Sequence, residues 1–296
     1  MQFKFILILN FTIIYCSSAQ TDIPFEFYDY SNEIDYKKIL SHSVNKKLNI
    51  EDYKKLLNLS EKKRDYKNSI KYLEKIISLG ENNISIKYKI ASYSSIVAKN
   101  TKSFASVKYI KKALKNYKSI LREDNFHLKS LTALAKLHAL LPSFLGGDKN
   151  KSKEYAKRIM KIDQIQANLI LGIINEIENK KNDAKNNYIK AIKIFYNQSK
   201  NQNNIDNLLL YELIDISVRF KIINSNTLLL LDEYNSYKGV NLIQLEWVYF
   251  RFAQVYLFLN NLKEAKYYAK KSLDLNSNFI KSKEIINIIN WKKFIS

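Results

Sequence analysis

The stretch ANLILGIINEIENKKNDAKNNYIKAIKIF, residues 167–195, decides the fold. In it Leu171 and Gly172 are followed by Ala184, Tyr188 and Ala191, with lysines and asparagines between them. The small residues allow two antiparallel helices to approach closely, and the leucine and tyrosine fill the space between the helices. Such a pair cannot bury its apolar stripe alone, so we expect further pairs to stack on it.

The same skeleton recurs at the same spacing near both ends of the chain. Leu57 and Ser69 lie 12 residues apart, as do Gly172 and Ala184, and also Ala253 and Ala265. This pattern of Leu-Gly, Ala, aromatic residue and Ala resembles the tetratricopeptide repeat family. The resemblance implies an all-α fold, a right-handed α-solenoid of stacked antiparallel helix pairs.

Extended along the chain, the resemblance predicts a repeat array over residues 50–279. Regular copies are expected at about 50–82, 166–197 and 245–278, and degenerate copies at about 84–124, 127–163 and 203–238. In the copy at 84–124 the spacing between the marker residues grows to 22, which predicts longer helices around Thr101. Residues 280–296 are expected to form a C-terminal capping helix that covers the last pair with Ile285, Ile286, Ile289, Trp291 and Phe294.

The copy at 127–163 contains an insertion, LPSFLGGD, at residues 141–148. Its proline ends the preceding helix, its two glycines permit positive φ, and its aspartate can cap the next helix. Phe144 and Leu145 either form a lip over a groove or pack on the next helix, and the amides near Gly147 are a candidate anion site. The residues of interest in this loop are Pro142, Phe144, Gly146, Gly147 and Asp148.

Composition supports a helical array and argues against a nucleic-acid reader. Only two prolines and five glycines interrupt the chain, too few for a turn-rich β protein. The net charge is +21, yet only five of the 49 basic residues are arginine, the residue on which base and phosphate recognition relies. The lysines either solvate the surface or bind an anionic polymer or lipid surface through clusters such as Lys62-Lys63-Arg64, Lys111-Lys112 and Lys270-Lys271.

Residues 1–19 are expected to be a secretory signal peptide. Lys4 precedes an apolar run from Phe5 to Cys16, which as a helix spans about 18 Å and is too short to cross a ~30 Å bilayer core. Ser17-Ser18-Ala19 predicts cleavage after Ala19 and export, most simply to a bacterial periplasm. A lipoprotein anchored at Cys16 is the alternative. Residues 20–49 are then an entry segment with one short helix.

Catalytic and metal-binding patterns are missing from the sequence. Cys16 is the only cysteine, and the three histidines, His42, His127 and His138, lie far apart. His138 is expected to be a core residue, and the carboxylates of Glu212 and Asp215, which share a helix face, are interpreted as surface charge. With no phosphate loop or nucleophile motif, we expect no enzyme, no metal and no cofactor.

The resemblance places partner contacts on the first helix of each copy, along the concave side of the array. Carried onto the two best copies, these positions are Gln166, Leu169, Ile173, Glu176 and Ile177, and Trp247, Phe250, Gln254, Leu257 and Phe258. We expect a non-catalytic extracytoplasmic scaffold that binds a protein or peptide there, with Trp247 and Phe250 as anchors. Three alternatives stay open: a face covered by neighbouring helices, a solute-handling protein with an enclosed small-molecule pocket beside the insertion, and a lysine-rich binder of an anionic polymer or lipid surface.

Overall fold

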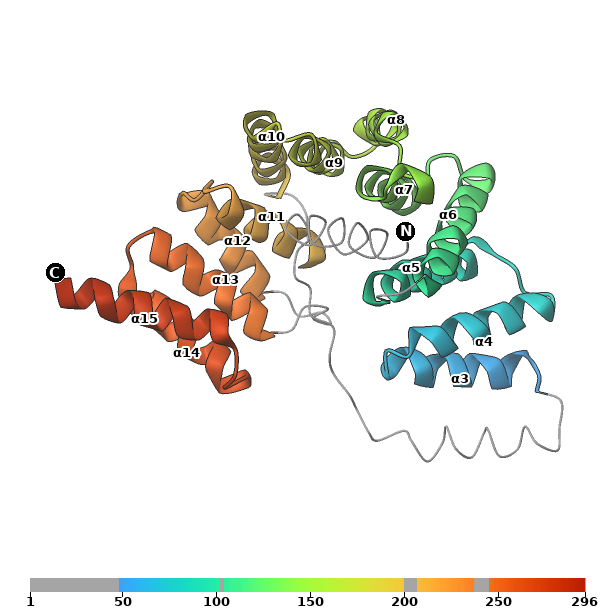
Figure 1. The fold of residues 1–296 in the computed structure, drawn as a ribbon, viewed down its shortest axis with the longest axis horizontal. Coiled ribbons are helices and arrows are strands. Elements are labelled where there is room, and N and C mark those ends of the chain that lie inside the picture. Colours follow the sequence, from blue (N-terminus) through green and yellow to red (C-terminus); the bar gives the residue numbers. More distant parts are fainter. Residues whose placement is uncertain (1–47, 102–103, 200–206, 237–244, 296) are drawn as a thin grey trace, which may run out of the picture. The chain divides into compact units, whose positions relative to one another are not determined.

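The computed structural model describes residues 48–101, 104–199, 207–236 and 245–295 (Figure 1). The predicted signal peptide and nearly all of the predicted entry segment lie outside these ranges. Within them the chain forms 13 α-helices and no strand, so the all-α prediction is confirmed. The helices belong to two compact units, and the division falls between Lys180 and Lys181. Among the described helices, none is long and apolar enough to span a membrane.

The N-terminal unit holds the helices up to Lys180, and each packs on the next along the chain. Its elements are α3 (Ile50–Lys62), α4 (Tyr66–Ser78), α5 (Ile84–Asn100), α6 (Ala105–Glu123), α7 (Leu128–Leu140), the 3₁₀ turn η2 (Ser143–Leu145), α8 (Lys149–Met160) and α9 (Gln164–Ile177). Helices α5 and α6 are 17 and 19 residues long, against 13 each for α3 and α4. The predicted lengthening around Thr101 is therefore confirmed.

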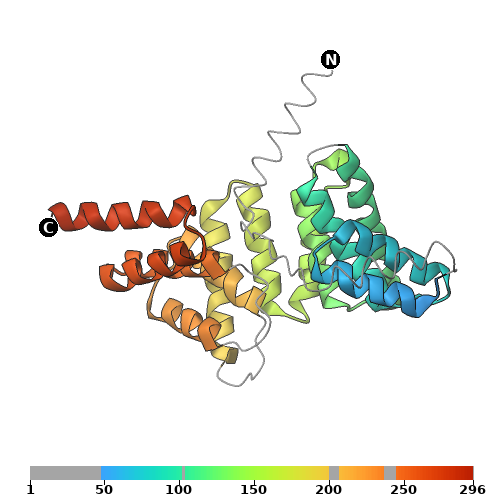
Figure 2. The ribbon, with the colours of Figure 1, turned by 90° about the horizontal axis from the view of Figure 1, so that it is seen from below.

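The C-terminal unit begins at Lys181. Its described elements are α10 (Lys181–Ser199), α11 (Asn207–Arg219), α12 (Ser225–Ser236), α13 (Leu245–Phe258), α14 (Leu262–Leu275) and α15 (Ile280–Ile295). Helix α11 packs on α12 and α13, α13 packs on α14, and α15 packs on both α13 and α14. Figures 1 and 2 show α15 at the margin of this unit, along α14.

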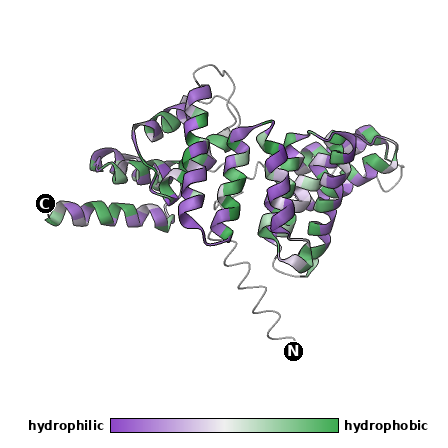
Figure 3. Ribbon diagram, turned by 90° about the horizontal axis from the view of Figure 1, so that it is seen from above, coloured by the Kyte–Doolittle hydropathy of each residue, from purple (hydrophilic) through white to green (hydrophobic). Residues whose placement is uncertain are grey.

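The small residues of the repeat skeleton are buried, as the sequence predicts. Ala184 and Ala191 of α10 have no exposed surface, and neither have Ala253 of α13 and Ala265 of α14. Tyr188, between the two alanines of α10, is also fully buried and meets the Phe220 ring edge-on at 4.8 Å between centroids. Apolar and polar residues alternate along the helices, which Figure 3 shows as alternating colours along the ribbons.

Buried serines join neighbouring helices at other small-residue positions. The Ser152 hydroxyl of α8 donates to the Ala135 carbonyl of α7 at 2.7 Å, and the Ser272 hydroxyl of α14 donates to the Glu246 carbonyl of α13 at 2.8 Å. Ser282 of α15 then bonds to Ser272 at 2.7 Å. A hydroxyl is small enough for close helix approach, and its buried oxygen is satisfied by a hydrogen bond across the interface.

Four helices end in the same left-handed turn at a residue other than glycine. The residue with positive φ is Arg64 after α3, Asn179 after α9, Lys221 after α11 and Asn260 after α13. In each case the amide of the following residue donates to a carbonyl five positions back, at 2.8 to 2.9 Å, which is the Schellman arrangement. The turn lies seven residues after Leu57, Gly172 and Ala253, the small-residue positions of the regular copies. The pair α11–α12 therefore follows the repeat geometry although its sequence lacks the repeat skeleton.

The insertion at residues 141–148 is a closed loop. Gly146 has φ +100, and a Cβ on Gly147 would lie 1.7 Å from the Leu141 carbonyl oxygen, so both glycines are required. Asp148 caps α8 by accepting the Asn150 and Lys151 amides, as the sequence predicts. Leu145 packs against the core formed by α5 to α9, whereas Phe144 is 64% exposed. Of the two apolar residues in the insertion, Leu145 therefore packs against the neighbouring helices and Phe144 does not.

Lys221→Gly is expected to raise the free energy of unfolding by about 0.5 to 1 kcal/mol, because Lys221 is exposed and its left-handed conformation strains a side chain. Equilibrium urea unfolding measures this change. The matched control is Lys270→Gly on the exposed face of α14, which should lower stability by about 1 kcal/mol. Equal destabilisation by both variants would contradict the turn assignment.

Candidate functional site

The five predicted contact positions on α9 are mostly packed. Leu169 has no exposed surface, and Ile173 and Ile177 pack against the core formed by α5 to α9. Gln166 and Glu176 are half-buried. This helix contributes chiefly to the core of the N-terminal unit, so its part in partner binding stays a prediction.

The five positions on α13 differ among themselves in access. Phe250 is buried, with its ring 5.7 Å from that of Phe279 in the turn before α15, and the half-buried Trp247 meets Phe279 edge-on at 4.9 Å. Gln254 accepts a hydrogen bond from Arg251 at 2.7 Å. Leu257 is half-buried, and Phe258 is 49% exposed. Phe250 thus belongs to the core of the last repeat, while the row from Trp247 to Phe258 reaches the surface.

Helix α15 extends this row. It follows α14 after a short turn, as α14 follows α13, so α15 runs in the same sense as α13. The Lys281 ammonium of α15 lies 4.4 Å from the centre of the Trp247 ring, which fixes the two rows side by side at their N-terminal ends. Spacings of seven and three residues place Ile288 and Trp291 on the same side of α15 as Lys281.

We name the surface formed by these two rows the α13–α15 face. Its exposed apolar members include Trp291 at 63% and Ile288 at 44%. Lys292 lies on its flank, four residues after Ile288. The members of the face are Trp247, Gln254, Leu257 and Phe258 on α13, and Lys281, Ile288 and Trp291 on α15.

The closing helix does not cover the last pair in the predicted way. Ile285 and Ile289 are buried and Ile286 packs beside them, as predicted. Trp291 and Phe294 are 63% and 88% exposed. Helical periodicity explains the difference, because these two residues lie more than 100° around the helix from the Ile285–Ile289 stripe. The sequence signal that was missed is the second apolar stripe on α15.

A buried ionic cluster joins α11 to α13 behind the α13–α15 face. The Asp215 carboxylate has no exposed surface and accepts from the Arg219 Nε at 2.9 Å, and the Arg251 guanidinium forms a second ion pair with it. Arg251 also holds Gln254 of the face and lies 5.3 Å from the Phe250 ring centre. The interpretation of Asp215 as surface charge was wrong. The signal available in the sequence was Arg219, four residues further on, in a chain that uses arginine rarely.

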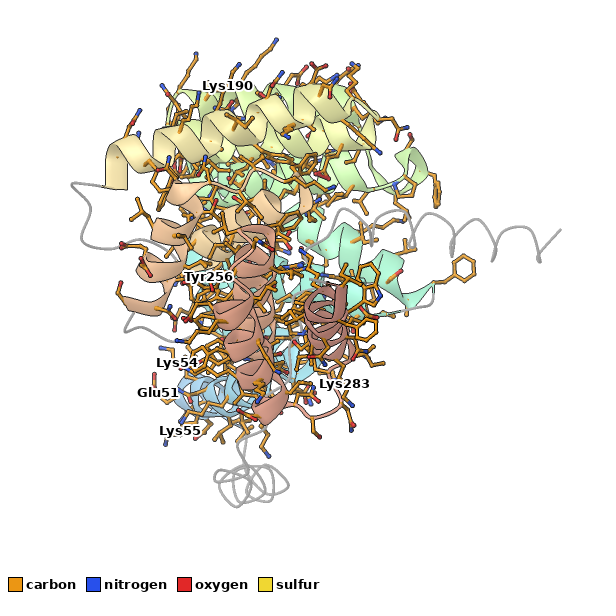
Figure 4. All side chains as sticks on the ribbon, turned by 90° about the vertical axis from the view of Figure 1, so that its left-hand side faces the viewer. Glu51, Lys54, Lys55, Lys190, Tyr256 and Lys283 are labelled. Carbon is orange, nitrogen blue, oxygen red and sulfur yellow. The ribbon has the colours of Figure 1, made fainter. Side chains whose placement is uncertain are left out.

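The predicted lysine clusters are partly engaged within the protein. Lys112 pairs with Glu74, and the Lys271 ammonium lies 4.7 to 5.9 Å from the ring centres of three tyrosines, Tyr267, Tyr249 and Tyr268. Lys63 and Arg64 belong to the turn after α3. Figure 4 shows lysine side chains projecting from separate elements, among them Lys54 and Lys55 of α3, Lys190 of α10 and Lys283 of α15.

The described histidines are structural. His127 caps α7 by accepting the Ser130 amide, and His138 is buried with its Nδ1 2.7 Å from the Gly146 carbonyl oxygen. The Nδ1 proton is donated to that oxygen, so the neutral ring leaves Nε2 unprotonated, and burial lowers the pKa of His138. His42 lies outside the described residues. In the part of the chain that the structure describes, no group of three or more His, Cys, Asp or Glu side chains is placed to hold a metal ion.

The backbone amides of the insertion loop, which were the candidate anion site, are already hydrogen-bonded within the protein. The Gly146, Gly147 and Asp148 amides donate to carbonyls of Ser143, Pro142 and His138, at 3.0, 3.0 and 2.8 Å. The Asp148 carboxylate, which accepts the Asn150 and Lys151 amides, adds a negative charge at the end of the loop and so disfavours an anion there. Leu145 and His138 occupy the interior of the loop.

A family model described as tetratricopeptide repeat matches residues 248–279, which comprise most of α13, all of α14 and the turn before α15. Residues 248–279 therefore form a tetratricopeptide repeat. No curated protein matches the chain in sequence. The family match covers this one repeat, and the packing of consecutive helices within each unit agrees with a solenoid of the same kind.

One solved structure supports the fold over most of the chain, and two others are similar to it at lower TM-scores. A tetratricopeptide repeat protein from Parabacteroides merdae aligns at 15% identity over 87% of this chain and 90% of that one, with a TM-score of 0.50. A crystal structure of MamA aligns at 16% identity over 59% and 99%, with a TM-score of 0.42. The structure of Pseudomonas aeruginosa pilF aligns at 11% identity over 80% and 96%, with a TM-score of 0.46.

Asp215→Asn is expected to lower the free energy of unfolding by about 3 kcal/mol or more, because it leaves two arginines, one of them buried, without their counter-charge. Urea unfolding followed by circular dichroism gives the value. Asp232→Asn on the exposed side of α12 is the matched control and should change stability by less than about 0.5 kcal/mol. Similar small changes in both variants would show that Asp215 is not buried in a paired state.

His138 makes stability depend on pH. Because burial lowers its pKa below the unfolded value near 6.5, the unfolded chain takes up a proton first, and stability falls as the pH drops below about 6.5. The slope contributed by one proton is at most about 1.4 kcal/mol per pH unit. Comparing urea unfolding at pH 7.5 and 5.0, His138→Gln should lose this component and His127→Gln should retain it. An unchanged pH dependence in His138→Gln would refute the assignment.

Proposed function

We propose that the protein is a non-catalytic scaffold that binds a protein partner through the α13–α15 face. The tetratricopeptide repeat fold is generally one of protein interaction. The observation that carries the proposal is the exposure of Phe258, Ile288 and Trp291 on two adjacent helices whose other sides are packed. Large apolar side chains grouped on a soluble surface mark interaction sites, and tryptophan is a frequent anchor.

Contacts within the protein order the side chains of the α13–α15 face before any partner binds. Trp247 is fixed between Phe250, Phe279 and the Lys281 ammonium, and Gln254 is held by Arg251. Arg251 is in turn held by the buried Asp215 carboxylate. A surface that is ordered before binding loses less conformational entropy when a partner docks. We therefore place Trp247 in the floor of the site and Trp291 and Phe258 at its exposed contacts.

We also propose that the mature chain acts outside the cytoplasm. The support is the sequence of residues 1–19, with its charged start, short apolar run and Ser-Ser-Ala cleavage site. Cleavage after Ala19 would remove the chain's single cysteine, so the scaffold would act without thiol chemistry. The amino-terminal sequence of the protein purified from its own cells tests this placement, and an intact Met1 would refute it.

Affinity recovery tests the face. The protein, tagged at its C-terminus, is crosslinked in its native cells and recovered in low and high salt, together with Phe258→Ser and Trp291→Ser variants. Both variants should reduce partner recovery at least tenfold, because an apolar anchor is lost. The matched control is Phe144→Ser, which removes a phenylalanine from the insertion loop that is 64% exposed, against 49% for Phe258, and should have no effect.

Two results would contradict the proposal. If partner recovery is the same in all three variants, the α13–α15 face is not the site. If only polyanions or lipids are recovered, and high salt releases them, the lysines bind the partner, because such binding weakens steeply with ionic strength.

A further inference from the structure

We propose that the partner of the α13–α15 face is a second copy of this chain, paired through α15 in antiparallel orientation about a twofold axis near Ile288. This inference rests on the proposed function of the face and names its occupant. It is carried by the second apolar stripe of α15 and by the charges within and beside that stripe.

The outer stripe of α15 is continuous over the whole helix. Ile280, Ile288, Trp291 and Ile295 are 68%, 44%, 63% and 60% exposed. At 100° per residue these four side chains fall within about 80° of one another around the helix. Ser282, Ile285 and Ile289 lie on the packed side of α15 and are buried. Helix α15 is therefore apolar on two separate sides, only one of which is covered by the described helices of its unit.

The stripe does not suit the stacking of another repeat. Thirty-four residues separate equivalent positions of successive repeats, so Asn287 occupies in α15 the place that the fully buried Ala253 occupies in α13. Asn287 and Asn290 are exposed polar residues, and they form the side on which a following helix would have to approach closely. The apolar stripe lies on a different side, where a partner can pack laterally.

The charges on this stripe complement themselves under twofold symmetry. Glu284 lies four residues before Ile288, within the stripe, and Lys292 lies four residues after it, on the flank. In an antiparallel pair centred on Ile288, Glu284 of each copy faces Lys292 of the other, which gives two ion pairs from one self-complementary surface. Neither side chain forms an ion pair with another residue of the described ranges.

The same arrangement pairs the apolar residues. Ile288 of one copy meets Ile288 of the other at the axis, and Trp291 of each lies within one turn of both Ile288 and Glu284 of the other. Lys281 falls opposite Ile295, where its aliphatic stem can cover the isoleucine. An apolar centre flanked by two symmetric ion pairs is the pattern by which helices select an antiparallel partner.

Sedimentation velocity over a range of protein concentrations, at about 0.15 M salt, tests the pairing. The purified protein should shift from monomer to dimer as concentration rises, and Trp291→Ser should remain monomeric at concentrations where the parent is half dimeric. Glu284→Lys and Lys292→Glu should each weaken dimerisation roughly tenfold, because two like-charged contacts replace two ion pairs.

The combined variant Glu284→Lys with Lys292→Glu separates a second copy from any other partner. In a symmetric dimer the swap restores both ion pairs, so dimerisation should return to within about threefold of the parent. Phe144→Ser should dimerise as the parent does. A protein that stays monomeric throughout, or a double variant that is as weak as the single ones, would overturn the inference.

A crosslink fixes the orientation. In a Cys16→Ser background, Ile288→Cys lies at the proposed axis and should form an intermolecular disulfide on mild oxidation, whereas Asn290→Cys on the opposite side should not. Equal crosslinking at both positions would contradict the axis. If the protein is monomeric but still recovers a different protein through Trp291 and Phe258, the inference fails and the proposed function stands.

Discussion

The left-handed turn that closes four of the described helices is the constraint on which the rest of the structure depends. It reverses the chain over very few residues, so within each unit the two helices of the pairs α3–α4, α11–α12 and α13–α14 must lie antiparallel and in close contact. Close contact in turn requires a small residue such as Ala265, or a serine whose hydroxyl bonds across the interface, as in α8 and α14. When this turn repeats, the first helices of successive pairs run in the same sense. Trp247 and Lys281 can therefore lie side by side although 34 residues separate them.

Where charge is buried, this lysine-rich chain uses arginine. The Asp215 carboxylate has no exposed surface and is held by Arg219 and Arg251, whereas the carboxylates that pair with Lys54, those of Glu51 and Glu81, are 72% and 34% exposed. The planar guanidinium can satisfy a carboxylate and stack on a ring at the same time, and Arg251 does both, with Asp215 and Phe250. Because arginine is scarce in this sequence, Arg219 and Arg251 could have indicated a carboxylate that is buried and needs a directional partner. The net charge by itself identifies no surface.

The sequence predicted the helix pairs because their signal is local: Ala253 and Ala265 report close approach, and Asp65 and Asp148 report helix starts. It missed the turn at Lys221 because a non-glycine residue adopts the left-handed conformation there. It placed Phe250 at the surface and Asp215 in solvent because both depend on which helix packs alongside, and a single helical stripe does not contain that information. The exposed side of α15 was missed for a related reason, since its apolar residues were all assigned to one packed face. Residues of the candidate site are therefore predicted less well than the fold that carries them.

The chain contains two tryptophans, Trp247 in the floor of the α13–α15 face and Trp291 at its exposed edge, so tryptophan emission reports on this face directly. The most direct measurement is acrylamide quenching of the Trp247→Phe variant, in which only Trp291 emits, as the complex forms. If the face is the interaction surface, the emission of Trp291 should move to shorter wavelength and its quenching should fall in proportion to the complex. A complex that forms while Trp291 stays as accessible to acrylamide as in the free protein would contradict the account.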